Sequence, residues 1–387
     1  MDRISGVKKR LEFVVKISKY CNLRCRYCYE LHDLHKRERM SLEDIRRMFS
    51  TVAEHVLTHG YELVHFIWHG GEPLLIKPAY YREVADIQRS AFAGVCQVRN
   101  TVQTNLTLLP EGILELIREG FFEGLGVSWD PYGSDRVDVR GRLRDDAVID
   151  NLQTLIDRDI PCGAITVLSR GTVAAAVRTF KVFDELKLAH RFLPYYMSAD
   201  DGQSAAQALT FDEIRAAYVD LADAWLASKN ATPVDPIEEL LRYAIDYLRG
   251  ERRPVFDPDR DEFVFIVDVD GGLWGVNGAY DPAEKYGNIF TEPLDRCLGS
   301  PQRRRLVDQI RSRMDRTCAA CAYHGACPGK YVAHATAAER QLLDDDGCLV
   351  REAVTHILKR LSETGLDRSV VEARVASEPR PSLAPAA

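Results

Sequence analysis

Residues 11–28 read LEFVVKISKYCNLRCRYC, and they decide the fold and the chemistry expected of this chain. Leu11 to Ser18 is an apolar run, which predicts a buried strand. Cys21, Cys25 and Cys28 follow directly in the next loop. In proteins built from parallel strands and helices, the chemistry takes place at the carboxyl ends of the strands. The three thiols therefore mark the expected site.

The unit of a strand followed by a helix repeats with a period of about 30 residues, as in βαβ structures. Ser41 and Asp44 predict the capped start of a first helix, whose apolar residues recur at spacings of three and four until Gly60. Further strands are expected at 63–68, 98–104, 124–129, 164–168 and 191–196, and further helices at 80–92 and 110–120. The alternation implies an α/β protein with a parallel sheet. Six such units suit either a doubly wound sheet or an incomplete barrel.

The pattern changes near residue 200, and four regions are expected. Residues 1–200 carry the repeating units, and 201–262 form a helical linker region with helices at 211–227 and 236–248. Residues 263–364 form a smaller cysteine-bearing unit that ends in a helix at about 350–361. Residues 365–387, ending PRPSLAPAA, are expected to be a disordered tail.

The composition argues against several classes of protein. With 387 residues and a net charge of -7, the chain is not expected to bind nucleic acid or an anionic membrane as its main partner. No apolar run approaches the roughly 18 residues of a membrane span, and charges occupy the place of a signal peptide's apolar stretch. We therefore expect a cytoplasmic protein. In that compartment its ten cysteines are more often metal ligands or catalytic groups than disulfide partners.

Six of the ten cysteines lie in two tight groups, and the first group suggests an iron-sulfur cluster. Three thiolates within eight residues can hold three irons of one [4Fe-4S] cube and leave the fourth iron open to a small molecule. Zinc is the alternative, because it takes four ligands and His32 and His35 lie close in the sequence. The isolated Cys96, Cys162 and Cys297 are expected to be small core residues.

The spacing Cys21-x3-Cys25-x2-Cys28, with an aromatic residue at Tyr27, resembles the motif of the radical S-adenosylmethionine (radical SAM) enzymes. The resemblance implies a partial (β/α)6 TIM-like barrel whose open iron holds the amino and carboxylate groups of SAM. In that family, reductive cleavage of SAM gives methionine and a 5′-deoxyadenosyl radical, which removes a hydrogen atom from the substrate. Similar motifs follow in the family's order as far as residue 200.

Three of these motifs imply contacts with SAM. Gly70-Gly71-Glu72-Pro73 is similar to the family's GGEP motif, whose glycines let the backbone approach a ligand and whose carbonyls and carboxylate can receive the SAM ammonium. Asn105 lies in a segment similar to the family's TNG, and Ser128 and Arg140 resemble residues that help to hold the SAM carboxylate. The SAM-binding residues implied by the resemblance are Tyr27, Gly70, Gly71, Glu72, Pro73, Asn105, Ser128 and Arg140.

The second tight group of cysteines lies in the C-terminal unit and consists of Cys318, Cys321 and Cys327; Cys348 follows about twenty residues later and is counted with it as a fourth ligand. Four thiolates close the coordination of either a [4Fe-4S] cube or a structural zinc ion, and the spacing does not decide between the two. With Asp270-Gly271 and Gly287-Asn288-Ile289 before it, the arrangement resembles the SPASM domain of radical SAM enzymes that modify peptides and proteins. The resemblance implies one auxiliary [4Fe-4S] cluster on the four cysteines.

Three positions depart from the complete SPASM pattern. Val276 and Asn277 stand where a Cys-Asp pair is expected, and Tyr331 stands where a later cysteine ligand would fall. An inner auxiliary cluster is therefore not expected, although Cys297 lies near enough in sequence to replace a ligand. The acid of that pair is the base in sulfatase maturases, and the amide of Asn277 cannot accept the proton. This difference argues against sulfatase maturation.

The resemblance to family members with one auxiliary cluster implies an oxidoreductase that acts on a ribosomally made precursor peptide (RiPP biosynthesis) and joins a side-chain carbon to an aromatic ring, giving a cyclophane. Only about ten residues precede the first strand, so a separate protein or the edge of the barrel is expected to recognise the leader. A flavodoxin or ferredoxin is the expected electron donor. Two alternatives remain open: oxidation or epimerisation of a small sugar or aminocyclitol, and a zinc-stabilised binding protein without chemistry.

Overall fold

The computed structural model describes residues 9–195, 205–276 and 281–364. A sheet of ten strands runs through the described part of the chain in the order β10-β9-β8-β1-β2-β3-β4-β5-β6-β7. The first six strands along the chain are β1 (Arg10–Ser18), β2 (Leu63–Gly70), β3 (Gln97–Thr104), β4 (Leu125–Ser128), β5 (Cys162–Leu168) and β6 (His190–Pro194). All six are parallel to their neighbours among these strands.

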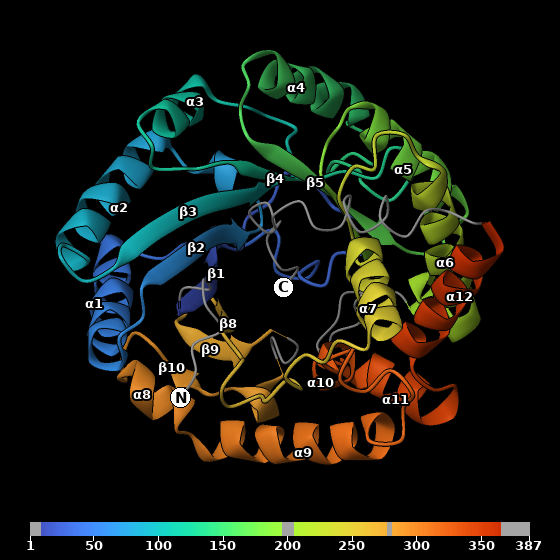
Figure 1. The fold of residues 1–387 in the computed structure, drawn as a ribbon. Coiled ribbons are helices and arrows are strands. Elements are labelled where there is room, and N and C mark those ends of the chain that lie inside the picture. Colours follow the sequence, from blue (N-terminus) through green and yellow to red (C-terminus); the bar gives the residue numbers. More distant parts are fainter. Residues whose placement is uncertain (1–8, 196–204, 277–280, 365–387) are drawn as a thin grey trace.

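Five helices connect these strands, and Figure 1 shows them on the outside of the curved sheet. They are α1 (Leu42–His59), α2 (Pro78–Ala91), α3 (Glu111–Arg118), α4 (Asp145–Asp157) and α5 (Ala176–Glu185). A doubly wound sheet carries helices on both faces, whereas here they form one outer layer. The structure therefore confirms the partial (β/α)6 TIM-like barrel.

The ends of α1 follow the sequence signals closely. The Ser41 hydroxyl accepts a hydrogen bond from the Asp44 amide, and the Asp44 carboxylate accepts one from the Ser41 amide. Gly60 ends the helix in the left-handed conformation, with φ of 65°. Between these caps the side chains that face the sheet are buried, among them Phe49 and Val52. Capping and the apolar stripe together place this helix as predicted.

The C-terminal unit continues the barrel sheet. Strand β8 (Val264–Val267) pairs in parallel with β1, and β9 (Gly272–Gly275) and β10 (Gly287–Asn288) extend the sheet in antiparallel fashion. Gly271, with φ of 85°, makes the turn between β8 and β9. The following helices are α8 (Leu294–Leu298), α9 (Pro301–Cys318), α10 (Lys330–Ala333), α11 (Ala337–Asp345) and α12 (Leu349–Thr364).

The predicted linker region forms a wall of the molecule. Helices α6 (Phe211–Ala227) and α7 (Ile237–Arg249) share a buried core with α12, and the short strand β7 (Val234–Asp235) pairs with β6. Figure 1 shows these elements on the side of the ring opposite α1 and α2. No helix in the described residues is long and apolar enough to cross a membrane. The expected tail at 365–387 lies outside the described residues.

Candidate active site

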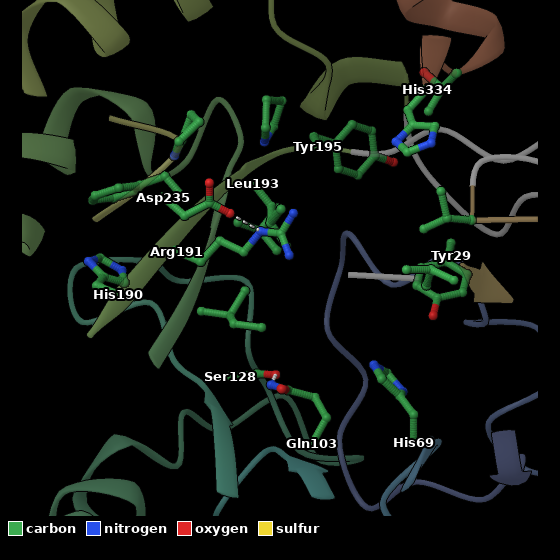
Figure 2. A pocket seen from close by; sticks show the side chains of 18 of the residues that line it. Tyr29, His69, Gln103, Ser128, His190, Arg191, Leu193, Tyr195, Asp235 and His334 are labelled. Atoms are coloured by element: carbon green, nitrogen blue, oxygen red, sulfur yellow. Dashed lines mark hydrogen bonds and ion pairs between the residues drawn. The ribbon is translucent and has the colours of Figure 1, made fainter. Parts of the chain in front are cut away.

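A cavity of about 700 Å³ lies inside the barrel. The carboxyl ends of β2, β3, β4 and β6 and the loop after β1 form part of its wall, and α7, α10 and β8 contribute from the other side. Figure 2 shows Gln103 and Ser128 at one end, Tyr29 and His69 along one side, and Tyr195 and His334 at the far end. The cavity thus lies where the strand order predicts the chemistry to be.

Cys21, Cys25 and Cys28 line this cavity. The loop that holds them folds over Leu23 and Leu34 in a small apolar cluster, and the Leu23 amide donates to the Cys21 sulfur at 3.3 Å. Burial raises the pKa of the Cys21 thiol to about 12. A thiolate at such a position needs a bound cation to stabilise its charge, so the loop has the chemistry of a metal site.

Zinc and an iron-sulfur cube hold their thiolate ligands at different distances. Around one zinc ion, with Zn–S bonds of roughly 2.3 Å, tetrahedral ligand sulfurs lie about 3.8 Å apart. Thiolates that each bind a different iron of one cube lie farther apart. Among the described residues, His55, His59 and Asp295 are the one group of three or more potential ligands whose ligand atoms all lie within 4.8 Å of one another.

The two glycines of the GGEP segment bring two backbone segments together. The Gly71 amide donates to the Ser18 carbonyl at 2.7 Å, and the Glu72 amide donates to the Tyr20 carbonyl at 2.9 Å. A Cβ atom on Gly71 would lie 2.2 Å from the Tyr20 carbonyl oxygen. Gly70 and Gly71 also line the cavity. Their small size therefore allows the cysteine loop to pack against this segment. The sequence analysis expected only that they let a ligand approach the backbone.

The Glu72 carboxylate joins the ends of β2 and β3. It accepts hydrogen bonds from the Leu74 amide at 2.9 Å, the Thr104 hydroxyl at 2.8 Å and the Asn105 amide at 2.7 Å. Glu72 does not line the cavity, and neither does Pro73, which begins a short 3-10 helix at Pro73–Leu75. A contact between the Glu72 carboxylate and the SAM ammonium stays a prediction, and the structure adds to it that Glu72 links two strand ends.

Tyr27 takes part in a buried polar network at the wall of the cavity. Its hydroxyl donates to Asp130 Oδ2 at 2.5 Å and lies 3.3 Å from an Arg136 guanidinium nitrogen. Arg136 also donates to the Asn105 carbonyl at 3.3 Å. Burial raises the pKa of Asp130, and the Arg136 charge opposes that rise. A buried guanidinium beside the cysteine loop is suited to a carboxylate ligand.

Arg136, and not Arg140, is the arginine in the cavity. Arg136 is buried and lines the cavity, whereas Arg140 is exposed and does not. The backbone explains the difference, since the Arg24 amide donates to the Val137 carbonyl and the Arg26 amide to the Asp135 carbonyl. These bonds pair the two segments and direct Arg136 towards the cavity. The sequence carries both arginines in one polar loop, and no periodic signal there distinguishes them.

Ser128 and Asn105 both line the cavity, as the resemblance implied. The Ser128 hydroxyl accepts a hydrogen bond from Gln103 Nε2 at 2.8 Å, visible as a dashed line in Figure 2. Asn105 Nδ2 donates to Asn22 Oδ1 at 2.9 Å and lies 3.7 Å from the Cys21 sulfur. Gln103 Oε1 is buried without a hydrogen-bond partner. This end of the cavity therefore holds polar groups that a bound ligand can engage.

Lys16 and His69 are site residues that the sequence analysis did not identify. Lys16 is fully buried on β1, donates to the Tyr29 hydroxyl and lies 3.3 Å from His69 Nδ1. Burial and the Lys16 charge lower the pKa of His69 to about 3, so the ring is neutral. Its Nδ1 accepts from the Gly70 amide at 2.7 Å, which leaves the proton on Nε2. The sequence signal that could have identified Lys16 is its place inside the otherwise apolar strand LEFVVKIS, because a lysine is rarely buried without a partner.

The four cysteines of the second group also come together, at the end of α9, in the loop after it and before α12. The charges of Cys348 and Cys321 contribute to the raised pKa of Cys318, which burial brings to about 12. The pKa of Cys327 is also about 12, with burial as the main cause and Cys348 and Cys318 adding to it. Such mutual effects require the thiols to be neighbours, as ligands of one cluster must be.

Two of the three positions that depart from the complete SPASM pattern have side chains in the cavity wall. Val276 and Tyr331 both line the cavity. Cys297 is fully buried in the main core, where a Cβ on Gly287 would meet its sulfur at 2.7 Å. It does not line the cavity. Asn277 lies outside the described residues.

Residues 15–181 match the family model of the Radical SAM superfamily. The segment that matches contains the cysteine loop, the GGEP segment and the buried network of Tyr27 and Arg136. Residues 15–181 therefore form a radical SAM domain, and the protein is an enzyme. SAM and [4Fe-4S], the cofactors predicted from the motifs, are confirmed by this match.

Relatives and solved structures extend the similarity beyond the barrel. A serine-type anaerobic sulfatase-maturating enzyme of Klebsiella pneumoniae is 24% identical over 328 residues, which are 82% of this chain and 80% of that protein. The structure of anSMEcpe with bound AdoMet and Cp18Cys peptide has a TM-score of 0.70 at 17% identity and covers 94% of this chain and 99% of that one. Streptococcus suis SuiB bound to precursor peptide SuiA has a TM-score of 0.55 at 17% identity, over 84% and 72% of the two chains. The two structures share the fold of this chain, including its C-terminal unit.

Proposed function

We propose that this enzyme modifies a ribosomally made precursor peptide and joins one of its side-chain carbons to an aromatic ring. The observation that carries the proposal is the cavity of about 700 Å³, which the barrel and the C-terminal unit enclose together and which Val276 and Tyr331 line in place of ligands to an inner cluster. Space that an inner cluster would fill is thereby left to a substrate.

The residues of the cavity fit the two cofactors of the family. Cys21, Cys25 and Cys28 would hold a [4Fe-4S] cube with one open iron, which supplies the 5′-deoxyadenosyl radical when SAM is bound. Asn105, Ser128 and Arg136 lie beside that loop, where they would orient SAM. The buried Arg136 guanidinium suits the SAM carboxylate, and backbone groups at Gly70 and Gly71 suit its ammonium. Glu72 supports these segments from behind through its three hydrogen bonds.

The second group of cysteines fits one auxiliary cluster. Cys318, Cys321, Cys327 and Cys348 would bind a second [4Fe-4S] cube with all four irons ligated. This site lies at the C-terminal unit, and Tyr331 and Lys330 of the neighbouring α10 line the cavity. Such a cluster supplies an acceptor for one electron close to the substrate.

The relatives support a peptide or protein as substrate. The curated relative from Klebsiella pneumoniae is a sulfatase-maturating enzyme, and the SuiB structure contains the precursor peptide SuiA. Forming a carbon–carbon bond between an sp3 carbon and a ring removes two hydrogens from the peptide. One leaves as a hydrogen atom to the 5′-deoxyadenosyl radical. The other leaves as a proton with one electron left over, which the auxiliary cluster would accept and return to an external electron carrier.

A second candidate is side-chain oxidation without a crosslink, which the 24% identity to a sulfatase-maturating enzyme favours. Both reactions give a peptide lighter by the mass of two hydrogen atoms, so mass alone does not separate them. Fragmentation does, because a ring suppresses cleavage between the two joined residues, whereas an oxidised linear peptide fragments throughout.

The test uses the reconstituted enzyme, a reductant, SAM and candidate peptides encoded beside its gene, with a separate leader-recognition protein added where one is encoded. We expect 5′-deoxyadenosine and a peptide with a ring. Replacing Cys21, Cys25 and Cys28 together by Ala should abolish both products. Turnover of sugars or aminocyclitols alone would contradict the peptide assignment, and a colourless zinc protein that forms no 5′-deoxyadenosine would contradict the whole proposal.

A further inference from the structure

A group of three potential metal ligands lies away from the cavity, between the barrel and the C-terminal unit. His55 and His59 are on α1 and Asp295 is on α8. Asp295 Oδ1 lies 2.9 Å from His55 Nδ1 and 2.7 Å from His59 Nε2. Within the described chain, no other group of three histidine, cysteine or carboxylate ligands is as compact.

The geometry of α1 places the two imidazoles on one face. Residues four apart on a helix lie one above the other, and the ring centroids of His55 and His59 are 4.4 Å apart. The position of α8 is fixed by the Leu294 amide, which donates to the Thr51 hydroxyl of α1 at 3.0 Å, and by the burial of Leu294. Asp295 is the next residue, so its carboxylate is held over the two rings.

The donor set and its burial suit a zinc ion. Two imidazole nitrogens and one carboxylate oxygen are ligands that zinc takes, with water completing the tetrahedron. His55 is buried, and its Nδ1 faces the Asp295 carboxylate. His59 and Asp295 are about half exposed, at 42% and 55% of their side-chain surfaces, so an ion can enter.

A small movement would convert the hydrogen-bonded group into a metal site. Ligand atoms about 2.0–2.1 Å from a tetrahedral zinc ion lie about 3.3 Å from one another. The oxygen of Asp295 must therefore move about half an ångström away from the two nitrogens, which rotation of an exposed aspartate side chain allows. The ligand nitrogens of the two rings lie within 4.8 Å of each other, and a turn of the partly exposed His59 ring would bring them to the same spacing.

We propose that His55, His59 and Asp295 bind one zinc ion, which joins α1 of the barrel to α8 of the C-terminal unit. None of the three lines the cavity, so the ion has a structural role and takes no part in the cleavage of SAM. The barrel and the C-terminal unit already meet where β1 pairs with β8, and the ion would join them at a second place.

The experiment compares zinc binding by the tag-free holoenzyme, with its iron-sulfur clusters reconstituted, and by matched variants. After equilibrium dialysis against zinc ions, we expect wild type to bind one zinc ion per chain more than His59→Gln or Asp295→Asn, whose affinity at this site should fall at least tenfold. Asp308→Asn, at an exposed position of α9, is the control and should bind zinc as wild type does. Zinc that enters cysteine sites is common to all four proteins and cancels in the comparison.

A second measurement reports the structural link. Zinc should raise the melting temperature of wild type and of the control but not of the two site variants. All four should form 5′-deoxyadenosine at equal rates, which shows that the variants are folded. Equal zinc binding by wild type and Asp295→Asn, or a zinc-induced rise in melting temperature that survives in His59→Gln, would overturn the proposal.

Discussion

Gly71 is the residue where the packing of the active-site loops is tightest. A methyl group there would meet the Tyr20 carbonyl oxygen at 2.2 Å and the Lys19 carbonyl oxygen at 2.4 Å, and backbone atoms cannot move aside as a flexible side chain can. We therefore expect Gly71→Ala to displace the cysteine loop and to lower the iron content and the rate of SAM cleavage at least tenfold. Iron analysis and 5′-deoxyadenosine formation measure both effects.

Gly60→Ala is the matched control for this prediction. Gly60 has φ of 65° but nothing within 4 Å of an added Cβ, so the substitution costs only the strain of a left-handed residue, about 1–2 kcal/mol. Its iron content should equal that of wild type. An active, iron-replete Gly71→Ala enzyme would show that the contact between the GGEP segment and the cysteine loop is not needed.

His190 is a buried base whose titration should appear in the stability of the protein. Its ring lies between Phe183 and Phe192, with centroids 4.2 Å from each, and burial lowers its pKa to about 3. In the unfolded chain its pKa is about 6.5. Between those values the unfolded state binds the proton and the folded state does not, so stability is complete above about pH 6.5 and falls as the pH is lowered.

For one such histidine the loss between pH 7.5 and 5.5 is about 1 kcal/mol. His190→Gln removes this contribution, so the variant, although less stable than wild type at pH 7.5, should lose about 1 kcal/mol less over the same interval. Urea unfolding at both pH values under anaerobic conditions measures the difference, and His35→Gln at an exposed position is the control. Identical losses in wild type and His190→Gln would mean that the folded ring takes up the proton.

At the scale of residues, the cysteine and glycine motifs placed their side chains at the cavity, whereas the single residue Arg140 was placed there incorrectly. The three cysteines and two glycines line the cavity because their spacing fixes a local loop. Arg136 could not be distinguished from Arg140, because its direction depends on pairing between its own segment and the distant cysteine loop. The link that Glu72 makes to Thr104 and Asn105 could not be predicted for the same reason, because these partners lie at the end of β3 and directly after it.

At the scale of elements, the pairing of β8 with β1 makes the C-terminal unit part of the barrel sheet. Phe265 of β8 is buried against Phe13 of β1, with ring centroids 5.9 Å apart. Phe265→Ala should destabilise the protein by about 3–5 kcal/mol, because it leaves a cavity in a core shared by both units. Urea unfolding of the anaerobic enzyme tests this, with Leu248→Ala, at an exposed site on α7, as a control expected to change stability by less than about 0.5 kcal/mol.

A cost below about 1 kcal/mol for Phe265→Ala would show that β8 and β9 do not share the barrel core.

The sequence predicted the six strands and α1 within a few residues, because the spacing of apolar residues and the helix caps are local signals. It could not show that β8 lies beside β1, since about 250 residues separate the two strands and register across that distance is set by packing. It also missed the role of α6 and α7, whose buried faces have α12 as their partner.

At the scale of the whole molecule, ten cysteines divide into two cluster sites and three separate thiols. Two [4Fe-4S] cubes require about eight irons per chain. Replacing Cys318 and Cys321 together by Ala should lower this by about four and leave the formation of 5′-deoxyadenosine intact, because Cys21 and its neighbours line the cavity whereas Cys318 and Cys321 do not. The modified peptide should no longer form, since its last electron has no nearby acceptor.

Cys96→Ala and Cys297→Ala are the controls, because neither thiol lines the cavity and Cys297 is fully buried in the core. Both should keep about eight irons, although Cys297→Ala should be the less stable of the two. Iron and sulfide analysis, with 5′-deoxyadenosine and peptide product measured on the same samples, separates the two sites. If Cys297→Ala lost iron as the double variant does, the core assignment of Cys297 would be wrong and a replaced inner ligand would be the better account. If the double variant still formed modified peptide, the electron would have to leave by a route that avoids the C-terminal unit.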